Sequence, residues 1–204
     1  MGIKERRERE KQVTRENILL VARRIAREEG WPALTIRKVA ESIEYSPPMV
    51  YEYFASKDEI LLELMREGFR QLMAAMQQAA ATAHDSEQRL FAIVDAYWSF
   101  ARNNMELYQV MNGMGGVALD SQATVQAGRE SSQLPLQVLE AWAQDNGIVL
   151  EDPFGSIEMV WSLLHGVVSL TMVGRIAGDE ARAKSLLLQT LHDLLAAWSA
   201  KKKE

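Results

Sequence analysis

Residues 34–61 read LTIRKVAESIEYSPPMVYEYFASKDEIL, and this stretch decides the fold. Four apolar residues near its start recur at the i, i+3, i+4 and i+7 spacing of one helix face: Ile36, Val39, Ala40 and Ile43. Thr35 stands before them as a helix N-cap. Ser46 followed by Pro47 marks the start of a second short helix, because the first helical position needs no amide donor. Two short helices joined by a tight turn form a helix-turn-helix, whose second helix can enter the major groove of DNA.

The second short helix divides its residues between an inward and an outward side. At about 100° per residue, Val50, Tyr53 and Phe54 can face a core. Four of their neighbours then point outward: Pro48, Met49, Tyr51 and Glu52. Ser56 is placed to cap the helix that follows, which continues to about residue 82.

A longer helix precedes the helix-turn-helix, and Gly30 and Pro32 mark its end. Its apolar face carries four residues at helical spacing: Ile18, Val21, Ala22 and Ile25. Lys4 to Lys11 form a run of mixed charge, which could extend this helix or form an arm that touches the DNA backbone. The preferred interpretation is a frayed, solvated end.

The rest of the chain is expected to be helical, because proline is scarce and apolar residues recur at spacings of three and four. Five further helices are expected near these ranges: 85–103, 104–112, 122–146, 153–176 and 180–199. The fold class is therefore all-α, with about nine helices in total. The segment from Phe154 to Ile176 is apolar around much of its circumference, which predicts cover on more than one side. Its uncharged part, Met159 to Gly174, has 16 residues and is too short to span a bilayer, so no membrane partner is expected.

The composition fits a folded chain in a reducing compartment. Of the 204 residues, 48% are hydrophobic and 25% are charged, which is ordinary for a globular protein. The absence of cysteine excludes disulfides, thiolate metal sites and cysteine nucleophiles, and it fits a cytoplasmic location. The charged residues 1–11 predict no signal peptide.

Charge is distributed unevenly along the chain. Residues 1–57 hold 12 Lys and Arg against 9 Asp and Glu, whereas residues 58–204 hold 11 against 19. A basic N-terminal part on an acidic body indicates that only the first part approaches nucleic acid. Chance asymmetry on a solvated surface is the alternative interpretation.

Residues 14–65 resemble the DNA-binding domain of the TetR family of bacterial transcriptional regulators. The residues that carry the resemblance follow the family's order and spacing: Ile18, Ala22, Gly30, Leu34 to Ala40, Ser46, Val50 to Phe54 and Ser56 to Leu61. The resemblance implies a three-helix helix-turn-helix DNA-binding domain, here 1–57, and a helical ligand-binding and dimerisation domain, here 58–204. The chain departs from the family at Glu44, where Gly is frequent, and at Pro47, Pro48 and Met49, where Lys, Gly or Thr are frequent.

The resemblance also implies a double-stranded DNA operator and assigns contacts to it. Four residues match positions that hold phosphates: Thr35, Tyr51, Tyr53 and Lys57. Arg37 matches a position that can reach a base edge, where arginine reads guanine. By its chemistry Glu52 could accept from a cytosine amino group, and Met49 could contact a thymine methyl. Ser46 and Pro48 complete the set of candidate DNA-binding residues. Two of the set have an alternative role without DNA: Tyr53 could pack in the core, and Glu52 could be an ordinary solvated charge.

The second domain is expected to hold a hydrophobic or aromatic small molecule. Methionine and aromatic residues suit an adaptable apolar site, and the middle helices supply most of the candidates: Trp98, Met105, Tyr108, Met111, Trp142, Trp161, His165 and Met172. The same residues suit an ordinary core. Trp161 to Gly166 resemble a Trp-x-x-x-His-Gly signature in the sensor domain of one TetR subgroup. His165 is either a polar handle in the pocket or a histidine at the dimer seam.

In the TetR family the last two long helices usually pair with those of a second copy as a four-helix bundle, which predicts a homodimer here. Three small residues of the first of these helices would allow close approach: Gly166, Ser169 and Gly174. The second helix has an apolar seam of five residues: Leu187, Leu191, Leu194, Leu195 and Trp198. The alternative is that both helices close the core of a monomer.

The sequence therefore predicts a ligand-responsive dimeric transcriptional regulator, with a repressor released from a palindromic operator as its leading form. A ligandless DNA-binding regulator or an activator on the same fold is one alternative, and a protein-binding module is another. An enzyme is not expected, because His84, His165 and His192 lack metal-binding spacing and no phosphate loop or serine-nucleophile motif occurs. No catalytic residue, cofactor or metal site is predicted.

Overall fold

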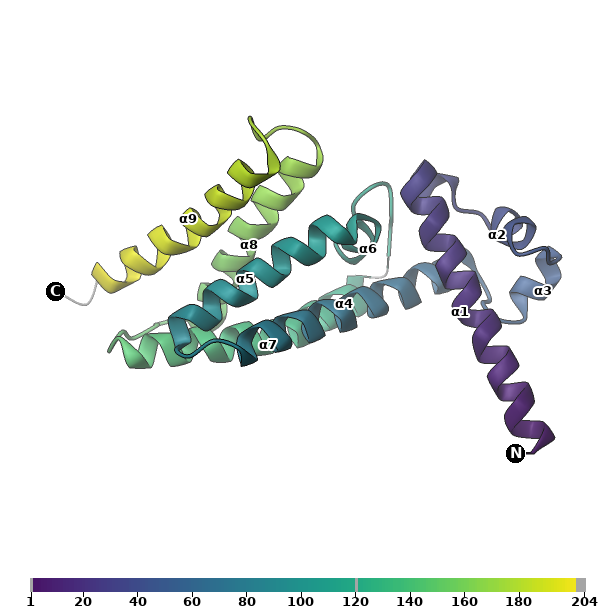
Figure 1. Ribbon diagram of the computed structural model, residues 1–204, viewed down its shortest axis with the longest axis horizontal. Helices are drawn as coiled ribbons and strands as arrows, with labels where there is room; N and C mark the ends of the chain where they lie inside the picture. The colour runs from purple at the N-terminus through teal and green to yellow at the C-terminus, as the bar shows by residue number, and fades with distance from the viewer. Residues whose placement is uncertain (1, 120, 201–204) are drawn as a thin grey trace. The chain divides into compact units, whose positions relative to one another are not determined.

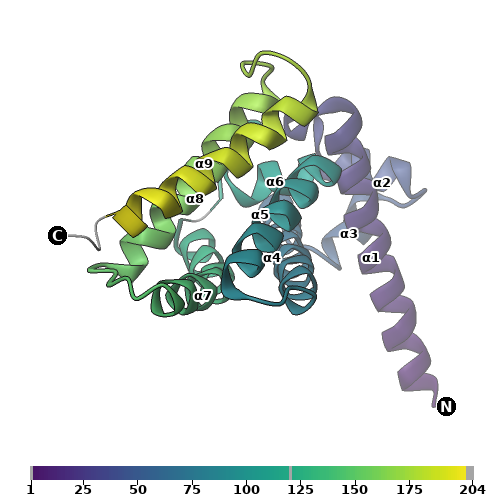
Figure 2. The same cartoon turned by 60° about the vertical axis from the view of Figure 1, so that its left-hand side comes forward.

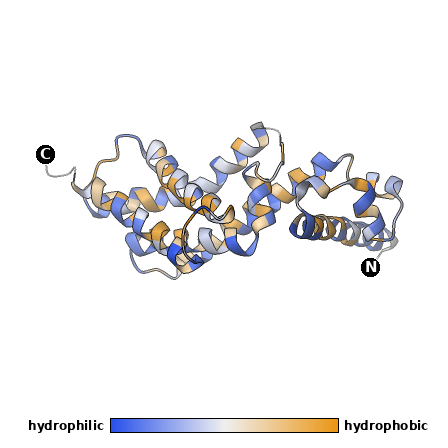
Figure 3. Cartoon of the chain, turned by 90° about the horizontal axis from the view of Figure 1, so that it is seen from above, coloured by the Kyte–Doolittle hydropathy of each residue, from blue (hydrophilic) through white to orange (hydrophobic). Residues whose placement is uncertain are grey.

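The computed structural model describes residues 2–119 and 121–200, and this part of the chain is helical, with no strand (Figure 1). Within these residues one short 3₁₀ helix, η1 (Trp31–Ala33), stands among nine α-helices: α1 (Ile3–Glu29), α2 (Ile36–Ser42), α3 (Pro47–Tyr51), α4 (Lys57–Ala81), α5 (Ser86–Asn103), α6 (Met105–Met111), α7 (Ser121–Asp145), α8 (Pro153–Met172) and α9 (Glu180–Ala200). The expected all-α fold is confirmed. In Figure 3 the helices carry both hydrophobic and hydrophilic residues, as amphipathic helices do.

The helices pack into two compact units, which are described separately. The first holds the described residues up to Phe69 and those of Asn104–Ala127. The second holds Arg70–Asn103 and the described residues from Gly128 onward. The domain boundary expected at residue 57 coincides with the start of α4. The first unit by packing differs from the expected domain, because it also includes the first part of α4 and all of α6. The boundary at residue 57 therefore stays a prediction.

In the first unit, α1 packs against η1, α2 and α6. The apolar face of α1 is buried, as its spacing predicts: Ile18, Val21, Ala22 and Ile25. The helix ends at Gly30, whose φ of +84° lies in a region that favours glycine. Trp31 follows and is 1% exposed, so the chain enters the core directly after this turn.

The N-terminal charge run is helical, so its interpretation as a frayed end is wrong. Helix α1 begins at Ile3, and every side chain from Lys4 to Val13 is exposed. The backbone N–H of Gly2 donates to Glu5 Oε2 at 2.8 Å, and Arg6 pairs with Glu10 at 2.8 Å. These local contacts stabilise a helix without tertiary packing, because residues four apart are neighbours on the helix surface.

The turn between α2 and α3 has Glu44, rather than the glycine frequent in the family, at a position with a left-handed backbone. Glu44 has a φ of +59°, and the Tyr45 N–H donates to the Ala40 carbonyl at 2.9 Å across it. This bond is the one that closes a helix C-terminus when the residue after the cap is left-handed. The turn therefore forms with glutamate, at the steric cost of a Cβ in this region.

In the second unit, α9 packs along α8, and both contact α5 (Figure 2). One face of α9 is buried in this core: Ala183, Leu187, Leu191, Leu195 and Trp198. Trp198 lies 6.3 Å from Trp142 of α7, measured between ring centroids. Most of the apolar seam expected on this helix thus closes the core of the single chain.

Within the described chain helix α8 is covered on one side. The expected cover on a further side requires a second copy and stays a prediction. Four residues at helical spacing are buried: Ile157, Val160, Leu164 and Val168. Six apolar side chains of this segment are exposed by at least 40%: Phe154, Met159, Trp161, Leu163, Leu170 and Val173. By length and composition alone α8 could cross a membrane, a property that core helices of soluble proteins share. Exposed apolar surface of this kind is typical of sites that contact a partner.

Helix α8 is also shorter than expected, ending at Met172 rather than at residue 176. Gly174 has a φ of +67°, and the Arg175 N–H donates to the Leu170 carbonyl at 2.8 Å. A glycine in this conformation ends a helix even when apolar residues continue beyond it.

Candidate DNA-binding surface and sensor domain

Helix α3 presents the outward residues that the sequence predicts. Pro48, Met49, Tyr51 and Glu52 are exposed, whereas Val50 is 0% exposed and anchors the helix. Phe54, just after α3, is also fully buried. A recognition helix needs this division, because the buried side fixes its orientation while the exposed side remains available to bases.

The other candidate DNA contacts lie on the N-cap of α2, on α2 and around the start of α4. Thr35 is exposed, and its Oγ1 accepts from the Lys38 N–H at 3.1 Å. Its hydroxyl proton can still donate to a phosphate. Lys57 and Tyr53 are half-buried, and Lys57 Nζ donates to the Trp31 carbonyl at 3.3 Å. Lys57 also begins α4, whose first-turn amides favour an anion.

Two further candidates are exposed with different local contacts. Arg37 pairs with Glu41 one helical turn later, at 2.8 Å between Nε and Oε1. A base contact by Arg37 must therefore replace or share this pair. Ser46 is the N-cap of α3 but makes no side-chain capping bond. All nine candidate DNA-binding residues lie in the first unit, and none is buried.

Arg15 of α1 supports the end of α3, and sequence reasoning did not single it out. Its Nη1 donates to the Tyr53 carbonyl at 2.7 Å, and its guanidinium lies 4.0 Å from the centroid of the Phe54 ring. Its Nη2 lies 3.7 Å from Glu63 Oε2 on α4. The sequence does place Arg15 on the buried face of α1, because it precedes Ile18 by three positions. This residue therefore links α1, α3 and α4 within the first unit.

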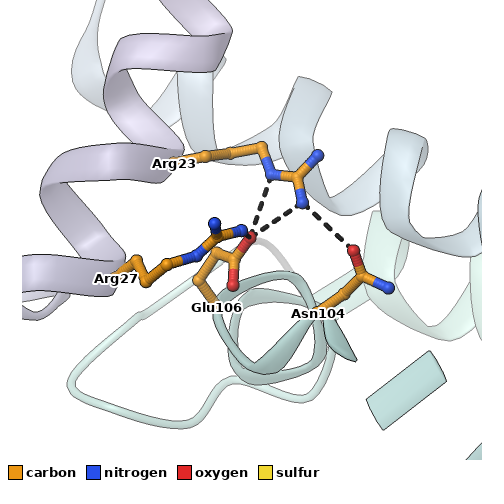
Figure 4. A network of polar contacts seen from close by, with 4 residues as sticks. All are labelled: Arg23, Arg27, Asn104 and Glu106. Carbon is orange, nitrogen blue, oxygen red and sulfur yellow. Dashed lines mark hydrogen bonds and ion pairs between the residues drawn. The ribbon is translucent and has the colours of Figure 1, made fainter. Parts of the chain in front are cut away.

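A buried carboxylate joins α6 to α1 (Figure 4). Glu106 is 3% exposed and its Oε1 accepts from Arg23 Nη2 at 2.8 Å and from Arg27 Nη2 at 2.7 Å. Arg23 also donates to Asn104 Oδ1 at 3.2 Å. Burial alone would raise the pKa of Glu106, but the hydrogen bonds from both arginines outweigh it and lower the pKa. The carboxylate is therefore ionised and paired at neutral pH.

The eight candidate ligand-binding residues are divided between the two units. The first unit holds Met105, which is exposed, and Tyr108 and Met111, which are buried. The second unit holds the other five, of which Trp98 and Trp142 are buried, Trp161 is exposed, and His165 and Met172 are half-buried. Among these eight, the structure brings Trp161 and His165 together, with ring centroids 5.1 Å apart and nearly parallel planes. Burial lowers the pKa of His165, so this imidazole is neutral at pH 7.

Trp142 has a feature that sequence reasoning could not anticipate. Its indole Nε1 is buried and has no hydrogen-bond partner among the described residues. A buried polar group is normally paired, and an unpaired one needs an explanation. Trp142 lines neither of two surface hollows of the second unit, one around Phe91 and α9 and the other around Asp85 and Asn146. Within the described residues no group of three His, Cys, Asp or Glu side chains could hold a metal ion.

Family profiles match both parts of the chain. The profile described as "Bacterial regulatory proteins, tetR family" covers residues 18–64, which include the helix-turn-helix. The profile described as "Tetracyclin repressor-like, C-terminal domain" covers residues 90–198. The chain belongs to the tetR family of bacterial transcriptional regulators, so it is a DNA-binding regulator of transcription. The likeness of residues 161–166 to a subgroup signature is not tested by these matches and stays a prediction.

Two named regulators are similar in sequence. The HTH-type transcriptional activator FasR of Mycolicibacterium smegmatis is 28% identical over 97 residues, which are 48% of this chain and 44% of that protein. The chain thus aligns with less than half the length of this relative. An HTH-type transcriptional regulator of Mycobacterium tuberculosis, Rv0681, is 24% identical over 79% of this chain and 72% of its own.

Solved structures share the fold at low sequence identity. A protein of unknown function from Rhodococcus sp. RHA1 has a TM-score of 0.77 and 23% identity, over 91% of this chain and 95% of that one. The TetR-family regulator PfmR from Thermus thermophilus has a TM-score of 0.67 and 21% identity, over 87% of this chain and 96% of that one. The fatty acid degradation regulator FadR from Bacillus halodurans has a TM-score of 0.67 and 18% identity, over 89% of this chain and 93% of that one.

Proposed function

We propose that this regulator is a cytoplasmic homodimer that binds a palindromic operator and leaves it when a hydrophobic or aromatic small molecule binds. The observation that carries the DNA-binding role is the exposed outward side of α3, held in place by the buried Val50 and Phe54. Met49 and Glu52 on this side would contact base edges. Thr35, Tyr51, Tyr53 and Lys57 would contact phosphates, which set the register of the protein on the duplex without reading sequence.

The exposed side of α8 supports a dimer through the last two helices. Met159, Leu170 and Val173 expose apolar surface there, and a Cβ built on Gly166 would meet no atom within 4 Å apart from its own stretch of helix. A helix from a second copy could therefore approach closely and cover the apolar residues. A dimer also serves DNA binding, because two recognition helices must read half-sites about one helical turn apart.

The unpaired Trp142 N–H supports a ligand site in the second unit. A ligand with an apolar body and one acceptor oxygen would bury its body among side chains of this unit and accept from Nε1. The neutral His165 would add a second polar contact without a charge to be desolvated. One protein of similar fold is a regulator of fatty acid degradation. A ligand with an apolar body and one acceptor oxygen would suit the unpaired Trp142 N–H.

Release from DNA would follow from a difference in ligand affinity between two shapes of the dimer. A ligand shifts such an equilibrium only by its differential affinity for the two states. The state with the higher affinity would hold the two copies of α3 at a spacing that does not match the half-sites. Activation rather than repression is the alternative, and one relative is named as a transcriptional activator. A DNA-binding regulator that has no ligand is a second alternative.

Contact variants on a selected duplex test the DNA-binding surface. Lys57→Gln and Tyr51→Phe should each weaken binding about equally on matched and mismatched duplexes, because phosphate contacts carry no sequence information. Glu52→Gln should instead change the preferred base at one position of each half-site. The exposed Glu140 of α7 offers a control, and Glu140→Gln should change neither property. Unchanged binding by all three surface variants would contradict the assignment of α3 and its flanks as the DNA interface.

A further inference from the structure

The N-terminal half of α1 carries unpaired cations on one face. At about 100° per residue, Lys4, Arg7 and Lys11 fall within about 60° of one another around the helix axis. All three are exposed, and none makes an ion pair or hydrogen bond among the described residues. We call Lys4, Arg7 and Lys11 the basic stripe. By contrast, the neighbouring Arg6 is paired with Glu10.

The acidic residues of this segment leave the basic stripe largely uncompensated. Glu5 accepts from the Gly2 backbone N–H at 2.8 Å, and Glu10 is held by Arg6 at 2.8 Å. Glu8 borders the stripe about 40° away from Lys4 and is the nearest acid to it on the helix wheel. Three cations with one bordering carboxylate give the face a net positive charge.

The basic stripe continues the face of α1 that packs against the helix-turn-helix. The same angular calculation places it on the side of Ile18, Ala22 and Ile25, which are buried. Between the stripe and this core lies Arg15, whose Nη1 donates to the Tyr53 carbonyl at 2.7 Å. Figure 1 shows the N-terminal half of α1 extending past the other helices of this unit. The stripe therefore leads away from the end of α3, where the candidate phosphate contacts lie.

We propose that the basic stripe is a second DNA contact, which binds the phosphate backbone flanking each half-site outside the reach of α3. This inference rests on the proposed operator binding and extends it. At about 1.5 Å per residue, the stripe is about 10 Å long, which spans about three phosphates of one strand at about 3.4 Å each. Lys and Arg contacts of this kind add affinity that depends on salt and not on base sequence.

A pair of charge-matched double variants tests the stripe. Arg7→Gln with Lys11→Gln removes two stripe cations, and Arg9→Gln with Arg24→Gln removes two exposed cations from the other sides of the same helix. Glutamine keeps helix propensity, and circular dichroism with thermal unfolding confirms that each variant is folded. Binding is measured by fluorescence anisotropy between about 50 and 200 mM salt, on a selected operator with long flanks and on one trimmed to its half-sites.

On the long duplex the stripe variant should bind roughly tenfold more weakly at about 0.1 M salt, and its slope of log affinity against log salt should fall by up to about 3.6 per dimer, from four lost contacts. The control variant should stay within about threefold of the wild type. On the trimmed duplex the stripe variant and the wild type should bind alike. Equal losses for both variants, or an unchanged slope for the stripe variant, would overturn the proposal. Failure of the wild type to bind any duplex would instead reject the proposed operator binding, and the inference with it.

Discussion

Arg23 Nη2 lies 2.8 Å from Glu106 Oε1, and this buried ion pair ties α6 to α1 within the first unit. Helix α1 also supports the recognition helix through Arg15. A displacement of α6 would therefore have to break a charged contact or carry α1 with it. Glu106 therefore holds α6 against the helix that supports the end of α3.

Replacing Glu106 should destabilise the first unit. In Glu106→Gln the arginines lose their charged acceptor, which should lower the free energy of unfolding by about 1–3 kcal/mol. We expect a loss near the lower end of this range, because Arg27 is 62% exposed and water can replace its contact with Glu106. Chemical denaturation measures the change. Glu41→Gln, which breaks the exposed pair with Arg37, should change stability little. Equal effects of the two variants would show that burial adds nothing at Glu106.

The Glu106 contact should also make stability depend on pH in acid. The pKa of Glu106 is lower in the folded state than its ordinary value of 4.5, because the hydrogen bonds from Arg27 and Arg23 outweigh burial. Its contribution is therefore complete above about pH 4.5 and is lost as pH falls through the folded-state pKa. The difference in unfolding free energy between the wild type and Glu106→Gln should stay constant down to about pH 4.5 and shrink as the pH falls further. A difference that stays constant below about pH 4.5 would contradict the assignment.

Charge on the outer side of α8 should dissociate the proposed dimer. Leu170 is 41% exposed, and in Leu170→Glu two carboxylates would be buried in a symmetric interface. We expect the dimer dissociation constant to rise by about a hundredfold or more. Sedimentation velocity across a concentration series measures this. Val149 is 87% exposed in the loop before α8, and Val149→Glu serves as the control. A dimer that tolerates Leu170→Glu would place the interface elsewhere.

The Trp142 indole should contribute to binding of an acceptor-bearing aromatic probe. Trp142→Phe removes the N–H and keeps an aromatic ring, so affinity for anilinonaphthalene sulfonate should fall roughly tenfold. Trp31 is the matched control, because its Nε1 is also buried without a partner but lies in the first unit. Fluorescence titration compares the probe affinities of Trp142→Phe and Trp31→Phe with that of the wild type. Equal affinities of Trp142→Phe and the wild type would remove Trp142 from the ligand site.

The sequence could predict most of the fold because local rules determine it. Apolar spacing assigns Ile18, Val39 and Val50 to the core, and all three are buried. Thr35 and Asp152 each stand directly before an apolar helix, and both accept a capping hydrogen bond. Such patterns depend on residues that are three or four apart, which a single sequence shows directly.

The remaining features depend on distant partners or on a second copy. Glu106 looks like a solvated residue at a helix start, and its partner Arg23 lies 83 positions earlier. The polar composition of the charge run before Val13 suggests fraying, whereas the Arg6–Glu10 pair supports a helix. The apolar circumference of α8 indicates cover on more than one side, and the described chain covers one side. The other side needs a partner that no single-chain pattern identifies.

Selection of DNA from a random duplex pool by the purified wild-type protein tests the central claim most directly. The protein is first unfolded and refolded, so that a releasing ligand carried through purification is removed. The account predicts enrichment of a palindrome whose half-sites are about one helical turn apart, bound with an affinity that falls steeply as salt rises. Recovery of no motif from the refolded protein would contradict the claim that the exposed residues of α3 read an operator.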